Sequence, residues 1–208
     1  MFSTPERQLR RRLPSIVPLL AIVAVVSSCT TTPERTSGGI VVEANDDITI
    51  TVRHYSATEL RDRYTSRNNP FIAPLMLFTP VELLVFDMTI ETTDPSAIID
   101  TSEIELLFAG ERYLNLTPRS LLRFWEGTGV YNDLEGQRRV RFERLINREL
   151  VTRPPVEKNG AAAGLAVFRA RRFPEEGRLS IEVPVTSLST GRTTRHRITL
   201  RLSTIAQE

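Results

Sequence analysis

Cysteine is almost absent from this 208-residue sequence, which contains a single one at position 29. The chain therefore cannot form an internal disulfide, and its stability has to come from a hydrophobic core. Histidine is nearly as scarce, because His54 and His196 are the only two. Neither has a second ligand at a spacing typical of metal sites, so no metal is expected.

Sequence patterns of the common enzyme classes are also missing. The chain has no GxSxG nucleophile elbow, no HExxH motif, no P-loop and no Rossmann glycine pattern. We therefore expect a protein that is not an enzyme and that needs no cofactor. A hydrolase is the alternative, and it requires polar groups that converge around His54 or His196.

Excess positive charge disappears once residues 1–28 are set aside. The whole sequence has 27 Lys and Arg against 25 Asp and Glu. Residues 1–28 contain four of these basic residues and one acidic residue, and removing them leaves 23 basic and 24 acidic residues, a net charge of −1. Nucleic-acid binding depends on attraction to phosphates, so no nucleic-acid partner is expected.

The first 28 residues have the features of an export signal. Four arginines between positions 7 and 12 precede an apolar run over residues 16–26, and small residues follow it. This order is typical of a secretory signal peptide. The run is shorter than the about 20 residues that a spanning helix needs, and Pro18 interrupts it. The arginines stay on the cytoplasmic side and predict export of the rest of the chain.

The segment Val26-Ser27-Ser28-Cys29 at the end of the apolar run resembles the lipobox of bacterial lipoproteins. The resemblance implies cleavage between Ser28 and Cys29 and a diacylglyceryl group on the Cys29 thiol, often with acylation of the new amino group. Two or more acyl chains anchor a protein stably, so membrane lipid is the expected partner. An ordinary signal peptide with an accidental cysteine, or an uncleaved anchor, is the alternative.

Position 30 bears on location through the same resemblance. In many Gram-negative bacteria an aspartate there retains a lipoprotein in the inner membrane, whereas this chain has Thr30. The expected location is the cell envelope, with the outer membrane favoured if the source is Gram-negative. The sequence thus predicts a signal peptide at 1–28, a lipidated cysteine with a flexible tether rich in Thr, Ser and Gly at 29–39, and one folded domain at 40–208.

Alternating apolar and polar residues dominate the predicted domain and indicate about eight short strands. The predicted strands cover residues 40–43, 48–53, 81–93, 102–108, 112–116, 164–169, 178–185 and 195–201. The turn cluster Asn45-Asp46-Asp47 makes the first two a hairpin. On 81–93, one face changes from Leu83 and Val85 to polar residues, so one end should be buried more deeply. The pattern resembles an immunoglobulin-like antiparallel β-sandwich in architecture.

Two or three helical insertions interrupt the strands. Ser56 and Glu59 have the spacing of a capping box before a helix that reaches Tyr64. Thr117-Pro118 predicts an N-cap and first residue of a helix through Trp125. A third helix covers Asp133–Leu150, although Val140 and Phe142 alternating with arginines also fit a strand. The proline-bounded loop 69–78 is predicted to cap the core, and residues 159–164 to form a flexible loop.

Arg141, Arg144 and Arg148 would share one face of the third helix and are the candidates for contact with an anionic surface, either lipid headgroups or an acidic partner protein. The alternative is a solvated face whose arginines pair with Glu143 and Glu149.

A second row of outward-facing arginines lies on the last predicted strand, and Glu182 on the neighbouring strand could neutralise it. The row consists of Arg195, Arg197 and Arg201.

Acidic residues gather near loops, at Asp46-Asp47 and at Asp94, Asp100 and Glu103. Calcium uses such oxygen ligands, but the EF-hand spacing is absent and turn chemistry explains the Asp pair equally well.

Together these features predict a membrane-anchored envelope lipoprotein whose β-sandwich body binds a partner, such as another envelope protein, or plays a structural role without catalysis. The second hypothesis is an envelope ligand-binding or transport accessory protein, with a pocket near Trp125 and Tyr131.

Overall fold

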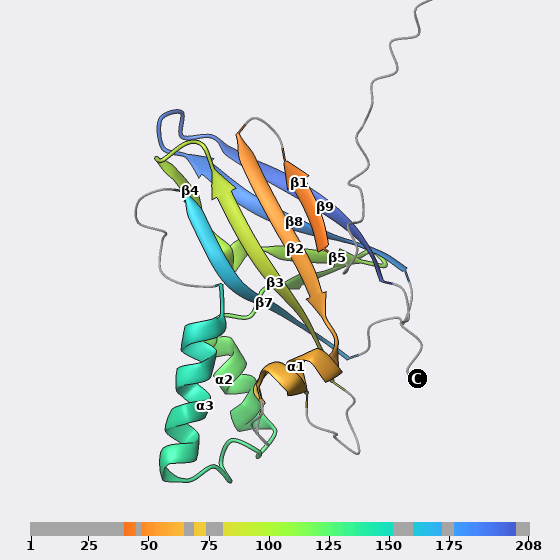
Figure 1. The fold of residues 1–208 in the computed structure, drawn as a ribbon, viewed down its shortest axis with the longest axis vertical. Helices are drawn as coiled ribbons and strands as arrows, with labels where there is room; N and C mark the ends of the chain where they lie inside the picture. The colour runs from red at the N-terminus through yellow and green to blue at the C-terminus, as the bar shows by residue number, and fades with distance from the viewer. Residues whose placement is uncertain are drawn as a thin grey trace, which may run out of the picture. The chain divides into compact units, whose positions relative to one another are not determined.

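In the computed structural model of the chain, the described residues form two antiparallel sheets and three α-helices (Figure 1). The structure describes residues 40–44, 47–64, 69–73, 81–151, 160–171 and 177–202, all of which belong to one compact unit. The described part is mainly β, and its two sheets pack face to face as the predicted β-sandwich.

The first sheet, sheet A, has the strand order β1-β2-β3-β7. Its strands are β1 (Ile40–Ala44), β2 (Ile48–Tyr55), β3 (Glu82–Thr92) and β7 (Ala161–Ala170). β1 and β2 pair antiparallel as the predicted hairpin. On β2, Ile48, Ile50 and Val52 are buried while the threonines between them are partly exposed. Successive side chains of a strand point to opposite faces, so this alternation directs one face of sheet A into the core.

The second sheet, sheet B, is built around β8 (Gly177–Ser187). β9 (Thr193–Leu202) pairs along one edge of β8, and β4 (Ala97–Ile99) and β5 (Glu105–Phe108) pair in succession along the other. β6 (Glu111–Leu114) continues the sheet beyond β5. Pro184 lies between the stretches of β8 that pair with β4 and with β5. A proline, which has no backbone N–H to donate, is tolerated at such a break in the ladder.

The inner faces of the two sheets form the sandwich core. Fully buried side chains from β3 of sheet A meet fully buried side chains of sheet B. They include Phe86, Met88, Ile90, Leu106, Ile181 and Ile198. Strands β6 and β7 approach each other at one side of the sandwich, where buried Asn115 connects both sheets. Its Nδ2 donates to the Thr101 carbonyl at 2.9 Å, and its Oδ1 accepts from the Val167 N–H at 2.9 Å.

The three helices form a second core, the helical core, with the outer face of sheet A. They are α1 (Ala57–Arg63), α2 (Pro118–Gly127) and α3 (Gly136–Glu149), which lie together at one end of the strands (Figure 1). Tyr55, Val85 and Val167 are in register across β2, β3 and β7, and all three are buried against the helices. The predicted deeper burial of this end of β3 is therefore confirmed.

The predicted starts of α1 and α2 are confirmed by their hydrogen bonds, whereas α3 starts at Gly136 and not at Asp133. The Ser56 Oγ accepts from the Glu59 N–H at 3.2 Å, and the Glu59 carboxylate accepts from the Ser56 N–H at 2.8 Å, which completes the capping box. The Thr117 hydroxyl accepts from the Ser120 N–H at 3.2 Å. Val140 and Phe142 lie in a regular helix, so the strand alternative is wrong there.

The loop predicted to cap the core does so in its described part, residues 69–73. Phe71 is fully buried in the helical core. The Pro70 carbonyl accepts a hydrogen bond from the indole Nε1 of Trp125 at 3.0 Å. Residues 74–78 lie outside the described residues.

Some predicted boundaries are wrong. Residues 101–103 form a 3-10 turn, η1 (Thr101–Glu103), because the Asp100 carboxylate accepts from the Ser102 N–H at 3.0 Å and holds the chain in a turn. The strand starts only at Glu105, and the short β4 was not predicted. Residues 161–164 were predicted as loop, but they pair with β3. The strand that was predicted to end at residue 53 continues through His54.

Candidate functional site

Cys29, on which the predicted anchor depends, lies outside the described residues, as do Ser28 and the predicted tether. Lipidation and signal cleavage therefore stay predictions. Within the described ranges, none of the helices is long and apolar enough to cross a membrane.

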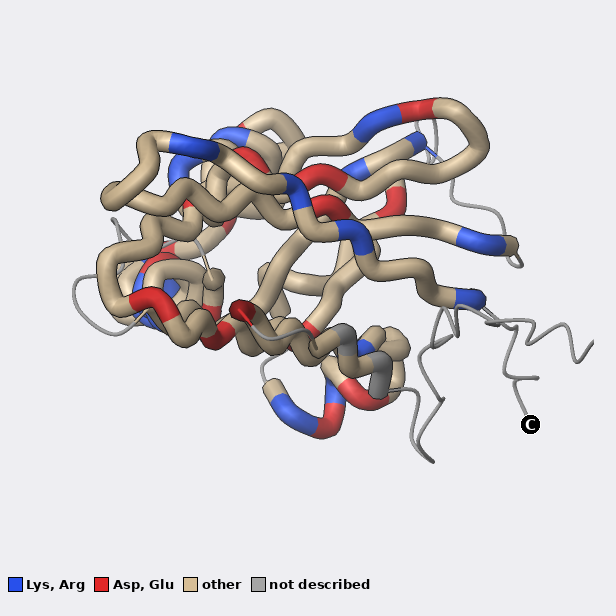
Figure 2. The backbone as a smooth tube through the Cα atoms, turned by 90° about the horizontal axis from the view of Figure 1, so that it is seen from above, with Lys and Arg blue, Asp and Glu red and all other residues tan. Residues whose placement is uncertain are grey.

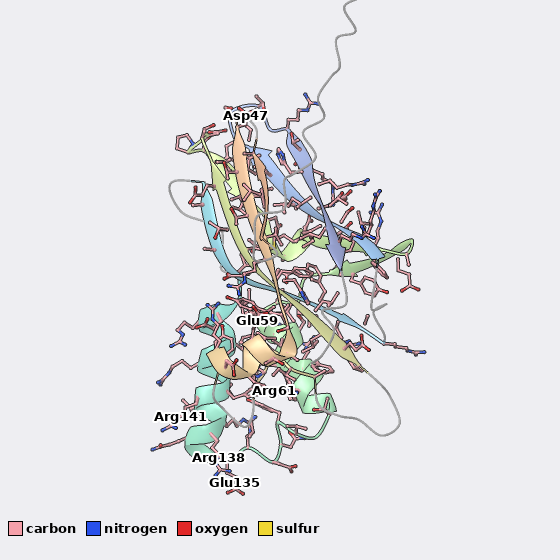
Figure 3. All side chains as sticks on the ribbon, turned by 45° about the vertical axis from the view of Figure 1, so that its right-hand side comes forward. Asp47, Glu59, Arg61, Glu135, Arg138 and Arg141 are labelled. Atoms are coloured by element: carbon pink, nitrogen blue, oxygen red, sulfur yellow. The ribbon has the colours of Figure 1, made fainter. Side chains whose placement is uncertain are left out.

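Helix α3 presents arginines on the side that faces away from the helical core. Phe142 and Ile146 are buried on its inner side, and Arg141, Arg144 and Arg148 are exposed. Figure 3 shows Arg141 on the side of α3 that points away from α1. Residues three or four positions apart share a helical face, so the structure brings the three candidate arginines together. Their contact with an anionic surface stays a prediction.

Only some arginines of α3 have acidic partners. The Nε of Arg139 lies 3.5 Å from the Glu143 carboxylate, and the Nε of Arg148 lies 2.6 Å from that of Glu149. Arg141 and Arg144 make no ion pair with any other described residue. Pairing with Glu143 and Glu149, the alternative reading of this face, thus leaves two exposed arginines unneutralised.

A network of charged and aromatic residues, which the sequence did not predict, connects α1 and α3 to sheet A. The Arg63 guanidinium lies 3.5 Å from the Asp87 carboxylate of β3 and 3.6 Å from the Glu149 carboxylate of α3. It also donates to the hydroxyl of Tyr55. The Tyr64 hydroxyl donates to Glu149 at 2.7 Å. The signal that could have revealed this network is the set of charged and aromatic residues on the outward positions of β2 and β3, next to an arginine-containing helix.

Burial and charge set the proton affinities in this network. Burial raises the pKa of Tyr64, and its hydrogen bond to the Glu149 carboxylate raises it further. Burial alone would raise the pKa of Glu149, but the bonds from Tyr64 and Arg148 and the charge of Arg63 lower it overall. The network therefore holds Glu149 ionised and Tyr64 protonated, which suits a clamp between elements.

The outer face of sheet B neutralises part of its own charge: Arg195 and Arg197 have acidic partners, whereas Arg201 faces Arg178 of β8 and no ion pair joins it to the described residues. Glu105 and Glu182 stand opposite each other on β5 and β8, an unfavourable pairing of like charges. Arg195 compensates it, since its guanidinium lies 3.7 Å from Glu105 and 4.0 Å from Glu182. The Nε and Nη2 atoms of Arg197 both donate hydrogen bonds to the carboxylate of buried Glu182. The predicted neutralisation by Glu182 is thus confirmed for Arg195 and Arg197, and Figure 2 shows basic and acidic positions interspersed along the backbone.

The two histidines lie on different sheets. His54 is on β2 and packs on the Phe86 ring at 5.3 Å between centroids, while His196 is on an inward position of β9. Burial lowers the pKa of both, and Glu59 opposes this at His54 whereas Asp47 opposes it at His196. Glu59 and Asp47 lie at opposite ends of β2 (Figure 3), so the histidines do not share a site.

Three of the acidic residues considered for calcium have other partners, while Asp46 lies outside the described residues. The Asp94 carboxylate accepts from the Ser96 N–H at 2.8 Å, and the Asp100 carboxylate caps η1. Glu103 faces Arg195 at 4.0 Å. Among the residues that the structure describes, no group of His, Cys, Asp and Glu side chains could hold a metal ion.

Trp125 and Tyr131, around which the alternative pocket was predicted, are both buried in the helical core. The Trp125 ring meets the Phe142 ring edge-on at 5.5 Å, and Tyr131 lies 5.9 Å from the same ring. The Tyr131 hydroxyl donates to Glu143. Phe142 therefore fills the space between these two aromatic residues.

No protein-family model matches the chain, and no curated protein matches it. Among solved structures, it is similar to the X-ray structure of Northeast Structural Genomics Consortium target SoR45, with 14% sequence identity and a TM-score of 0.39. The match covers 78% of this chain and 91% of the other.

Proposed function

We propose that the protein is a lipoprotein of the cell envelope, anchored in a membrane through acylated Cys29. The support is the coincidence, in the right order, of an arginine-rich lead, a short apolar run and the segment Val26-Ser27-Ser28-Cys29. The observation that carries the proposal is the position of the chain's one cysteine at the end of that run. Residues 29–39 then act as a tether between the lipid and the body.

The body is proposed to act as a non-catalytic binding or structural module, with another envelope protein as its partner. Its ionisable side chains make contacts that stabilise the fold, such as the ion pairs of Arg63 with Asp87 and Glu149. The histidines lie apart on different sheets. These contacts among the described residues are structural, and they support a binding or structural role for the body.

The sandwich is proposed to be of the immunoglobulin-like kind. Sheet A, in the order β1-β2-β3-β7, faces a sheet in which β9, β8, β5 and β6 follow one another. An antiparallel arrangement that ends in a β8–β9 hairpin supports this architecture.

Mass spectrometry of the amino-terminal peptide, after expression of the full chain in a bacterial host, tests the anchor. The expected peptide starts at Cys29 and carries the mass of acyl chains, and the Cys29→Ser variant lacks that mass and leaves the membrane fraction. A Ser37→Ala variant in the tether serves as the matched control and stays in the membrane. An unmodified Cys29, or a Cys29→Ser chain that remains equally membrane-bound, refutes the proposal.

Location in the outer membrane is part of the proposal and rests on Thr30. A Thr30→Asp variant is expected to move the lipidated protein from the outer to the inner membrane fraction of a Gram-negative host. Lipidated wild-type protein that already fractionates with the inner membrane contradicts this part alone.

A further inference from the structure

The outward side of α3 combines unneutralised positive charge with an exposed apolar side chain. Arg141 and Arg144 make no ion pair among the described residues, and Arg148 shares Glu149 with Tyr64 and Arg63. Val140 is 52% exposed on the same side, one turn before Arg144. We call Val140, Arg141, Arg144 and Arg148 the arginine face.

Folding alone does not favour this arrangement. Arg141, Arg144 and Arg148 follow one another at spacings of three and four residues, where like charges repel and destabilise a helix. The helix carries five arginines and two glutamates, whereas residues 29–208 as a whole have a net charge of −1. Among the arginines of α3, only Arg139 and Arg148 form ion pairs with described residues, so an excess of positive charge remains on this helix. Departures from local preference are expected where a protein makes functional contacts.

We infer that the arginine face docks on the anionic phospholipid headgroups of the membrane that carries the protein. A helix with cations around an exposed apolar residue fits the interface between headgroups and acyl chains, where it lies in the membrane plane. Anionic headgroups complement the cations, and each arginine near such a surface contributes to attraction. The inference rests on the proposed anchor, which holds the body close to the membrane.

A lipid surface fits the face better than an acidic protein does. The face is the solvent side of a single helix, and within the described part of the chain no ion pair fixes the direction of Arg141 or Arg144. Mobile headgroups can follow such side chains, whereas a specific protein interface usually buries a central aromatic anchor. Val140 is small and stands among the cations, as expected for shallow insertion.

An environment-sensitive dye at position 140 tests the docking. Lipidated Cys29 does not react with thiol reagents, so a Val140→Cys chain has one reactive thiol. The full lipidated protein is reconstituted into phosphatidylcholine vesicles with or without phosphatidylglycerol. A blue shift of the dye emission is expected with phosphatidylglycerol, and it is lost at high salt and in an Arg141→Gln/Arg144→Gln variant.

Two controls keep the result specific. Arg119→Gln/Arg123→Gln removes two exposed arginines from α2, and it is expected to leave the shift intact. A dye at Leu188→Cys, in the exposed turn between β8 and β9, is expected to show no dependence on lipid charge. A shift that ignores phosphatidylglycerol or survives the α3 double variant overturns the inference. A response to soluble polyglutamate without one to the vesicles also overturns it, in favour of an acidic protein partner.

A protein that is not lipidated can be recognised separately. Its Cys29 thiol stays free, so the Val140→Cys chain then binds two dye molecules instead of one. In that case the Cys29→Ser/Val140→Cys chain is titrated with the same vesicles. Binding that needs phosphatidylglycerol and falls about 25-fold in the α3 double variant still supports docking, since each arginine contributes about fivefold. Equal binding by the double variant overturns it.

Discussion

The two-residue turn between β5 and β6 contains a residue in a conformation that its side chain disfavours. Ala109 has a φ of 50° and Gly110 a φ of 84°, and Phe108 pairs with Glu111 across the turn. Both central residues of such a turn need positive φ, which costs a residue with a Cβ about 1–2 kcal/mol. Glycine at the second position avoids this cost and alanine at the first does not.

Replacing Ala109 by asparagine is expected to raise the free energy of unfolding by about 0.5–1 kcal/mol, because Asn-Gly is the preferred sequence for this turn. Urea denaturation measures the difference. Gly110→Ala is the matched control, since nothing lies within 4 Å of the added Cβ and only conformational strain changes. That variant is expected to lose about 1 kcal/mol. An Ala109→Asn protein that is less stable than wild type contradicts the argument.

At the scale of elements, the chain that leaves α3 passes directly over β7. A Cβ at Gly164 would stand 2.7 Å from the Glu149 carbonyl oxygen and 2.7 Å from the Val151 nitrogen. Val151 donates its N–H to the Leu165 carbonyl at 2.9 Å, which fixes this close approach. Glycine is therefore required here for space as well as for its φ of 149°.

Gly164→Ala is expected to lower the free energy of unfolding by about 2–4 kcal/mol, the sum of overpacking and backbone strain. Gly129→Ala is a suitable control, because Gly129 also has positive φ but has open space around it. The control isolates the conformational cost, so the excess loss at position 164 measures the steric part. Equal losses at both positions would show that α3 and β7 can separate without cost.

The clamp between α1, α3 and sheet A should make stability depend on pH. The pKa of Glu149 is lowered in the folded state, despite burial that would raise it, by Tyr64, Arg148 and Arg63. A carboxylate with a lowered pKa binds protons more weakly when folded, so its contribution is present above the unfolded value of about 4.3 and is lost as pH falls through the folded value. Glu59, whose pKa is also lowered, acts in the same direction.

Glu149→Gln is therefore expected to lower the free energy of unfolding at pH 7 by about 1–2 kcal/mol and to lose less stability than wild type below about pH 4.5. Denaturant titrations at several pH values measure both effects. Tyr64→Phe keeps the ring and removes only the hydroxyl that bonds to Glu149, and it should show an intermediate pH dependence. Parallel pH profiles for wild type and Glu149→Gln would rule out the clamp.

At the scale of the whole molecule, patterns that depend on neighbouring residues were predictable. The period-two alternation predicted the main strands, and the capping residues predicted α1 and α2, whereas α3 has no side-chain cap and was predicted from its residue pattern alone. Elements that depend on distant partners were not. β4 has only three residues, and Ala161–Ala163 have low strand propensity, yet β3 offers them a ladder of hydrogen bonds.

In the candidate site, too, only the features that depend on neighbouring residues were predictable. Helical spacing alone predicted that Arg141, Arg144 and Arg148 share a face, because residues three and four positions apart are neighbours on a helix. Which arginines have partners could not be predicted. The answer depends on Tyr131 in the preceding turn, which donates a hydrogen bond to Glu143, and on Tyr64 at the C-terminal end of α1, which donates one to Glu149.

Strand β3 belongs to both cores, because Phe86 faces the sandwich core and its neighbour Val85 faces the helical core. If the helices unfolded alone, Val85 and the other apolar residues on the outer face of sheet A would be exposed to water. The two cores should therefore unfold together, as one cooperative transition.

Phe142→Ala tests this coupling, since Phe142 packs against Trp125 and Tyr131 in the helical core. It is expected to lower the free energy of unfolding by about 3–5 kcal/mol. Fluorescence of Trp125, the one tryptophan, reports the helical core, while the β-sheet component of the infrared amide I band reports the sheets. Because both cores share β3, the two signals should shift to lower denaturant by the same amount and remain coincident. Loss of the Trp125 signal before the sheet signal would instead show that the sandwich is stable without its helices.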